Sequence, residues 1–149
     1  MLTETIGIDL SNIFRRWRSV PITFMPAHVS NRHSPAEKGS IYDLIDDAVR
    51  TYVVGAPAAA VAMCRAALER VLKEHYGKGR WNDLRLAEII ALASKRYNFV
   101  DESRLRRLTN GANGILHNYS KHARTSEQDE KTILEFLKTV KFLVQRAPG

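Results

Sequence analysis

The stretch PAAAVAMCRAALERVLKEHYG, residues 57–77, decides the fold that the rest of the chain must adopt. Its first half is almost entirely apolar, so a helix formed here can be covered by protein on most of its sides. Pro57 suits the first position of a helix, where no backbone N–H is needed, and Gly77 is typical of a residue that ends one. We therefore predict a central, buried helix from Pro57 to about Tyr76.

The segments before and after this helix repeat apolar residues at helical spacing and lack the long alternation that predicts strands. Short connections between helices favour antiparallel neighbours. The predicted fold is therefore all-α, an antiparallel bundle of four or five helices. The predicted helices begin near Ser40, Pro57, Asn82 or Asp83, Asp101, and Thr125 or Ser126, and the fourth reaches about Asn118.

Residues 1–39 differ from the rest of the chain, because they hold three of the five prolines and two of the five histidines. We predict an irregular N-terminal arm over 1–39 and a helical bundle domain over 40–149. Within the arm, only IDLSNIFRRWR, residues 8–18, can form a short amphipathic helix or strand. Its aromatic and basic side chains can bind nucleic acid, although such residues more often pack on their own domain or on a partner subunit.

Length and composition are those of one soluble domain, with 149 residues, 44% hydrophobic and 26% charged. No apolar run is long enough to span a bilayer, the first residues lack a secretory pattern, and the single cysteine, Cys64, cannot form an internal disulfide. These features predict a cytoplasmic protein with no membrane association. The net charge of +7 favours polyanionic partners, and between Arg80 and Arg124 nine basic residues face four acidic ones.

The fourth predicted helix carries a polar stripe, because Arg106, Asn110, Asn113 and His117 follow one another at spacings of four, three and four residues. His117 can act as a general acid or base near neutral pH, and Asn113 can orient a phosphate or a ribose hydroxyl. The alternative is a structural histidine among polar neighbours. The residues predicted to contact nucleic acid are Arg106, Arg107, Asn110, Lys121 and Arg124.

Two further features belong to helix interiors. Gly111 and Gly114 lie on the flank of the fourth helix, where they indicate a closely crossing helix or bound chain, or a locally weak helix. Arg65 and Glu69 lie inside the apolar second helix, with the basic residue first, which is the less favourable order for a pair four residues apart. We predict that they form a half-buried structural ion pair, the alternatives being partners on other helices or a small-ligand pocket shared with His117.

Metal and cofactor sites are not predicted. The sequence has no cysteine pair and no clustered His-x-x-x-His, and His28 and His33 lack an obvious third ligand. The stretch YGKGRW, residues 76–81, lacks the phosphate-loop pattern. We therefore expect a protein without metal or cofactor.

The stretches AVAMCRAALERVL, LAEIIALA and LRRLTNGANGILHN together resemble a domain family found alone or attached to restriction-endonuclease subunits. That family is similar to the HEPN superfamily of small helical bundles, which includes metal-independent endoribonucleases of toxin–antitoxin and phage-defence systems. The resemblance covers about residues 40–146. It rests on arginine-x-x-leucine-glutamate at Arg65, Leu68 and Glu69 and on asparagine-x-x-x-histidine at Asn113 and His117.

In active HEPN ribonucleases an arginine precedes the histidine by four to six residues, at a cleft between two subunits, and the pair promotes attack of the RNA 2′-hydroxyl on the adjacent phosphate. The resemblance makes His117 the histidine and Asn113 the polar residue of such a site. The arginine has no counterpart, because position 112 is Ala. The resemblance then implies that positive charge comes from a second subunit or from Lys121 or Arg124.

Three hypotheses follow. The chain can be a dimeric HEPN-like protein of a defence or toxin–antitoxin system that binds RNA, with or without cleaving it. It can be a catalytically silent module that dimerises or docks onto a restriction or toxin partner. It can also share only the fold and hold a small ligand. The absent arginine favours binding or docking over cleavage, and the basic excess favours RNA.

Overall fold

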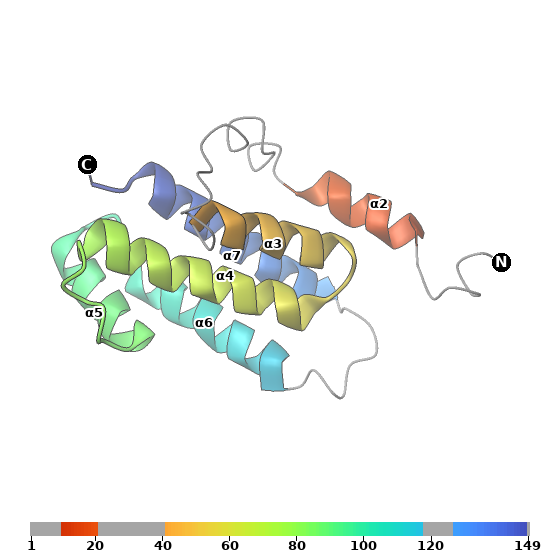
Figure 1. Ribbon diagram of the computed structural model, residues 1–149. Helices are drawn as coiled ribbons and strands as arrows, with labels where there is room; N and C mark the ends of the chain where they lie inside the picture. Colours follow the sequence, from red (N-terminus) through yellow and green to blue (C-terminus); the bar gives the residue numbers. More distant parts are fainter. Residues whose placement is uncertain (1–9, 21–40, 118–126, 149) are drawn as a thin grey trace.

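The helix predicted at the centre of the molecule is α4, Pro57–Val71. The computed structural model describes residues 10–20, 41–117 and 127–148. In it, α4 contacts α3, α6 and α7, so protein covers it on several sides (Figure 1). Pro57 lies in its first turn, as predicted. The buried side chains of α4 are those of Ala60, Val61, Cys64, Ala67, Leu68 and Val71.

All the other regular elements in the described ranges are helices, which confirms the all-α prediction there. Five α-helices were predicted at most, and the described residues form six, the additional one being α2 in the N-terminal arm. The helices besides α4 are α2 (Leu10–Ser19), α3 (Ile41–Val53), α5 (Leu86–Arg96), α6 (Glu102–His117) and α7 (Glu127–Gln145).

The helix starts follow their capping groups. α5 begins at Leu86, later than the predicted Asn82 or Asp83, because the Glu88 carboxylate accepts a hydrogen bond of 2.8 Å from the Arg85 backbone N–H and so fixes the first turn there. α6 begins beside Asp101, as predicted, and the Asp101 carboxylate accepts from the Arg104 backbone N–H at 3.0 Å. The predicted caps at Ser40 and Thr125 lie outside the described residues.

α4 continues into a π-helical turn, Leu72–Tyr76. The backbone N–H of Gly77 donates to the Leu72 carbonyl at 2.8 Å, which is the five-residue spacing of a π-helix. The helix ends at Gly77, as predicted, but the glycine serves packing, because a Cβ there would lie 2.7 Å from the Trp81 ring. The left-handed backbone expected at such a terminus comes later, at Lys78 with φ of 50° and at Gly79 with φ of 80°.

The arm is not wholly irregular, since α2 forms the short amphipathic helix that its sequence allows. Both oxygens of the Glu130 carboxylate on α7 accept hydrogen bonds from Arg15, at 2.6 and 2.8 Å. Arg16 is buried and donates to the same carboxylate at 3.0 Å and to the Val53 carbonyl at 3.4 Å. Val20, just after α2, belongs to the core. Residues 10–20 therefore pack on the bundle, and the predicted boundary at residue 39 does not separate them from it.

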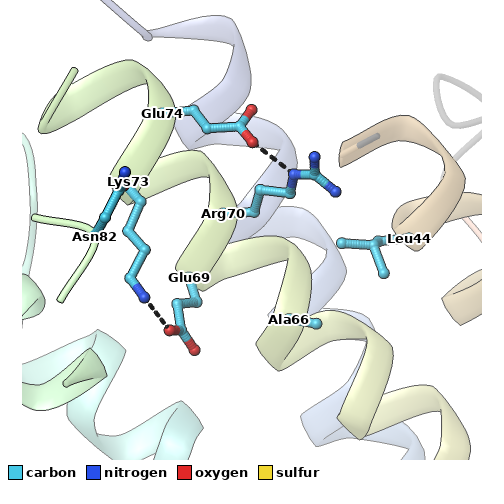
Figure 2. Close-up of a pocket in the computed structure, with 7 residues that line it drawn as sticks. All are labelled: Leu44, Ala66, Glu69, Arg70, Lys73, Glu74 and Asn82. Carbon is cyan, nitrogen blue, oxygen red and sulfur yellow. Dashed lines mark hydrogen bonds and ion pairs between the residues drawn. The ribbon is translucent and has the colours of Figure 1, made fainter. Parts of the chain in front are cut away.

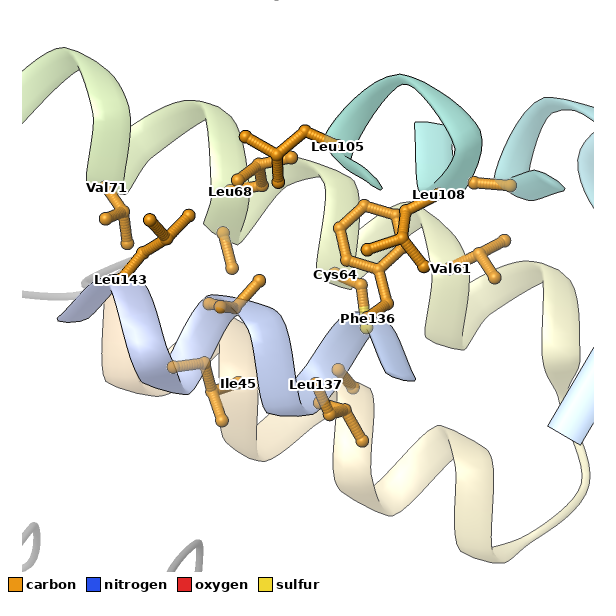
Figure 3. Packing of buried hydrophobic residues seen from close by; sticks show 14 of the residues in the cluster. Ile45, Val61, Cys64, Leu68, Val71, Leu105, Leu108, Phe136, Leu137 and Leu143 are labelled. Atoms are coloured by element: carbon orange, nitrogen blue, oxygen red, sulfur yellow. The ribbon is translucent and has the colours of Figure 1, made fainter. Parts of the chain in front are cut away.

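The core lies between α4 and the helices that contact it, as Figure 3 shows for Val61, Cys64 and Leu68 against side chains of α6 and α7. The apolar faces predicted from spacing are the faces that are buried. The buried positions among them include Ile45, Ala48, Tyr52, Ile89, Ile90, Ala93, Leu105, Leu108, Ala112, Ile133, Leu137 and Val140. Within the described residues no helix has both the length and the apolar character needed to pass through a bilayer.

Leu68→Ala tests whether α4 is the centre of the core. The Leu68 side chain is 0% exposed, so its truncation should lower the free energy of unfolding by about 2–5 kcal/mol through lost burial and the cavity left behind. Leu92→Ala is the matched control, because Leu92 on α5 is 38% exposed. Urea denaturation measures both, and equal losses in the two variants would contradict the central placement of α4.

Glu130→Gln tests the attachment of α2. Hydrogen bonds from Arg15, and then from Arg16, hold the pKa of Glu130 below its usual range. A carboxylate whose pKa is lower in the folded state stabilises the fold at pH above its unfolded-state pKa, and this contribution is lost as the pH falls through the folded-state value. At pH 7 the substitution should therefore cost about 1.5–3 kcal/mol of unfolding free energy, as for hydrogen bonds to a charged group.

The difference between Glu130→Gln and wild type should shrink below about pH 4, where the wild-type carboxyl is increasingly protonated. Denaturation at pH 7 and at lower pH measures it. Glu127→Gln is the matched control, because the Glu127 side chain is 87% exposed and its ion pair with Lys131 spans 3.7 Å. A loss in Glu130→Gln that is no larger than in the control would show that the carboxylate does not hold α2.

Candidate functional site

α6 presents its polar stripe to solvent, as predicted. Arg106, Asn110 and His117 are exposed, and Asn113 is half-buried where α6 meets α4. The opposite face of α6 is the core face. Its buried members are Leu105, Leu108, Ala112 and Ile115.

Asn113 is joined to α4 by a hydrogen bond from an arginine. Arg65 Nη1 donates to Asn113 Oδ1 at 2.7 Å, and the Arg65 residue is half-buried. Within residues 10–20, 41–117 and 127–148, no carboxylate forms an ion pair with Arg65. A guanidinium has five N–H donors, so most of its hydrogen-bonding capacity remains beside α6.

The predicted Arg65–Glu69 ion pair is wrong. Glu69 instead accepts from Lys73 Nζ at 2.6 Å, one turn further along the chain. The acid precedes the base in this pair, which is the favourable order for residues four apart. Arg65 takes the alternative open to it in the sequence, a partner on another helix.

His117 is the last residue of α6, one turn and about 6 Å of helical rise beyond Asn113. It is exposed and makes no hydrogen bond or ion pair with the described residues. An unengaged imidazole at a helix end is accessible to a ligand. Lys121 and Arg124, which were predicted to contact nucleic acid, lie outside the described residues.

Position 112 faces the interior of the bundle. Ala112 is 0% exposed and faces the core, so an arginine there would bury its charge among apolar side chains. Arg65 brings a guanidinium to the neighbouring residue, Asn113, from a different helix. Arg65 and Asn113 are thus joined from different helices, and His117 lies one turn beyond Asn113 on α6.

The arginines at the start of α6 are largely compensated. Arg106 donates to Glu102 at 2.7 Å, while Arg104 and Arg107 approach Glu135 of α7 at 3.5 and 3.4 Å. The hydrogen bond from Arg106 is the main cause that lowers the pKa of Glu102. Arg106 and Arg107 can therefore contact nucleic acid, as predicted, only if their ion pairs open or if each guanidinium also binds a phosphate.

The two glycines of α6 have different surroundings. A Cβ on Gly111 would lie 3.2 Å from Thr132 Cγ2, so α7 crosses close to α6 at this point. This agrees with the prediction of a closely crossing helix at Gly111. A Cβ on Gly114 would meet no atom within 4 Å. Gly114 therefore leaves the surface beside Asn113 open and does not serve packing within the described chain.

A pocket of about 350 Å³ lies on another face of α4. Figure 2 shows that its charged side chains pair with one another, Lys73 with Glu69 and Arg70 with Glu74, both at 2.6 Å. Neither Arg65 nor His117 lines it, so it differs from the small-ligand pocket considered from sequence. The lining residues are Leu44, Ala66, Glu69, Arg70, Lys73, Glu74 and Asn82.

Other reactive groups in the described ranges offer little chemistry. Cys64 is buried, and burial raises the pKa of its thiol to about 12, so it stays protonated. The described residues bring together no group of three His, Cys, Asp or Glu side chains able to hold a metal ion.

Comparisons with protein-family models, curated proteins and solved structures found no match. The HEPN resemblance therefore stays a prediction, and the site rests on its own geometry.

His117→Ala and Asn113→Ala separate a functional from a structural histidine. Because His117 is exposed and unengaged, its truncation should change the free energy of unfolding by less than about 0.5 kcal/mol. Asn113→Ala removes the acceptor of the Arg65 hydrogen bond and should cost about 1 kcal/mol or more. Urea denaturation measures both variants, and a larger loss for His117→Ala would assign that residue a structural role.

Proposed function

We propose that this chain is a HEPN-like RNA-associated protein that binds an RNA phosphate between α4 and α6. The observation that supports it is Arg65, a half-buried guanidinium that pairs with the neutral amide of Asn113 and with no carboxylate among the described residues. A cation removed from water without a counter-ion is unfavourable, and an anionic ligand relieves that cost.

A phosphodiester suits this guanidinium. Arginine presents its N–H donors in a planar fork that matches two phosphate oxygens, and one donor is already held by Asn113. That hydrogen bond orients the guanidinium before the ligand arrives, which reduces the entropy lost on binding. The net charge of +7 supports a polyanionic ligand such as RNA.

His117 supplies the group for cleavage. In the mechanism that the resemblance implies, the imidazole accepts the proton of the RNA 2′-hydroxyl as this oxygen attacks the adjacent phosphorus. The bond from phosphorus to the 5′-oxygen breaks, and this oxygen takes a proton from water. Arg65 stabilises the negative charge that develops on the phosphate, which is the role of the in-helix arginine in the family. The amide N–H donors of Asn113 remain available to orient a phosphate oxygen or a hydroxyl.

The biological setting is carried over from the resemblance. The chain would act in a cytoplasmic defence or toxin–antitoxin system. It would form a homodimer and bind a restriction or toxin protein as its partner. The alternative function, a catalytically silent dimerisation or docking module, uses the same open surface at Gly114.

The test is binding and cleavage of labelled single-stranded RNA with a chelator present. Arg65→Ala should weaken binding about 10- to 150-fold, because it removes a charge-assisted phosphate contact worth about 1.5–3 kcal/mol. Arg50→Ala is the matched control, since Arg50 on α3 is 74% exposed and pairs with Asp46. His117→Ala should retain binding and lose cleavage. Cleavage by wild type should leave cyclic-phosphate ends.

Each outcome separates the hypotheses. RNA binding that is equally strong in Arg65→Ala and Arg50→Ala would overturn the proposed phosphate site. Binding without cleavage by wild type would make the protein an RNA-binding relative that has lost catalysis. Absence of binding by folded wild type would leave the dimerisation or docking module as the better function.

A further inference from the structure

α2 exposes large apolar side chains on its outer face. Leu10, Phe14 and Trp17 are 50%, 65% and 48% exposed. Their spacings of four and three residues place them along one side of the helix, over about 10 Å of rise. Single exposed apolar residues are ordinary on protein surfaces, but an aligned set on one short helix is a contact surface.

The inner face of α2 is firmly attached, so this outer face is held in place. Arg16 is 8% exposed and bonds to Glu130 and to the Val53 carbonyl. Ser19 Oγ and the Tyr52 hydroxyl lie 2.8 Å apart in a hydrogen bond. These contacts orient Phe14 and Trp17 outward on a rigid support, which reduces the ordering cost of binding a ligand there.

The charge of α2 identifies the kind of ligand. The helix contains three arginines and no acidic residue. Arg18 follows Trp17 directly and lies one turn beyond Phe14, and it makes no ion pair with the described residues. Aromatic rings beside a free guanidinium are the combination that binds single-stranded nucleic acid, with bases stacked on the rings and phosphates held by the cation.

α2 packs on the side of the bundle formed by α3 and α7, because Arg16 bonds to the Val53 carbonyl at the end of α3 and to Glu130 near the start of α7. In Figure 1, α3 and α4 lie between α2 and α6. The outer face of α2 is therefore a surface separate from the α4–α6 site.

We propose that the outer face of α2 is a stacking platform for the bases of single-stranded RNA. The inference rests on the proposed function, because it takes single-stranded RNA as the ligand of this protein. Phe14 and Trp17 stack on successive unpaired bases, and Arg18 contacts the backbone between them.

Two other occupants fit less well. Pairing of α2 with the α2 of a second copy would bring arginines together with no acidic residue on either helix to neutralise them. A membrane surface would take only three apolar side chains from a ten-residue helix whose arginine-bearing face is engaged with Glu130, which leaves little apolar area to insert.

The test measures binding of a fluorescein-labelled twelve-nucleotide uridine oligomer by anisotropy, together with tryptophan fluorescence. Stacking should quench Trp17, whereas Trp81 is buried at 8% exposure and should respond little. Phe14→Ala/Trp17→Ala should weaken binding roughly tenfold or more, as expected for losing stacked bases. Phe14→Leu/Trp17→Leu should weaken it as much, because leucine keeps the apolar surface but has no ring.

Tyr42→Ala is the matched control and should leave binding unchanged. Tyr42 is 46% exposed at the start of α3, whereas α2 contacts Val53 at the end of that helix. Melting curves confirm that each variant is folded. Loss of binding in the alanine and leucine pairs, with Tyr42→Ala unaffected, supports the platform. A duplex of the same length should bind more weakly than the single strand, because its bases are already stacked.

RNA binding that depends on Arg65 but is unchanged in both α2 pairs overturns the platform and leaves the proposed function standing. No RNA binding by wild type overturns both. Co-sedimentation with phosphatidylserine vesicles that is lost in the alanine pair but kept in the leucine pair, with RNA binding unaffected in both, overturns the platform in favour of a membrane surface.

Discussion

The fold depends on burial of α4. Its inward side chains are small or aliphatic, and those of Ala60, Val61, Ala67 and Leu68 have no exposed area. A helix with so little polar surface in its first half is stable in water only when other helices cover it. α3, α6 and α7 provide that cover, and their buried apolar faces pack against it.

The same burial creates the candidate site. Arg65 is one of the few charged residues of α4, and it lies half-buried on the flank that faces α6. Asn113 gives it a neutral acceptor and leaves its charge uncompensated by the described residues. The positive charge of Arg65 is therefore available to an anion.

Helix order and core faces could be predicted because they depend on local spacing, as for Ile89, Ile90 and Ala93 on α5. The exposed positions of Arg106 and His117 follow from the same periodicity. The contact between Arg65 and Asn113 could not be derived in this way, because it joins residues 48 positions apart and depends on how two helices are placed together. The position of α2 could not be predicted for the same reason, because it depends on Glu130, more than a hundred residues away.

The π-helical turn at Leu72–Tyr76 changes the phase of the long α4 rod. Leu68 and Leu72 point inward, and continued α-helical spacing would next turn His75 toward the core. The turn holds one more residue than an α-turn, so His75 is exposed and Tyr76 points inward, where its hydroxyl donates to the Leu143 carbonyl at 2.7 Å. The π-turn thus adds one residue within a single turn of the helix. Before and after it, different positions of the heptad-like spacing face the core.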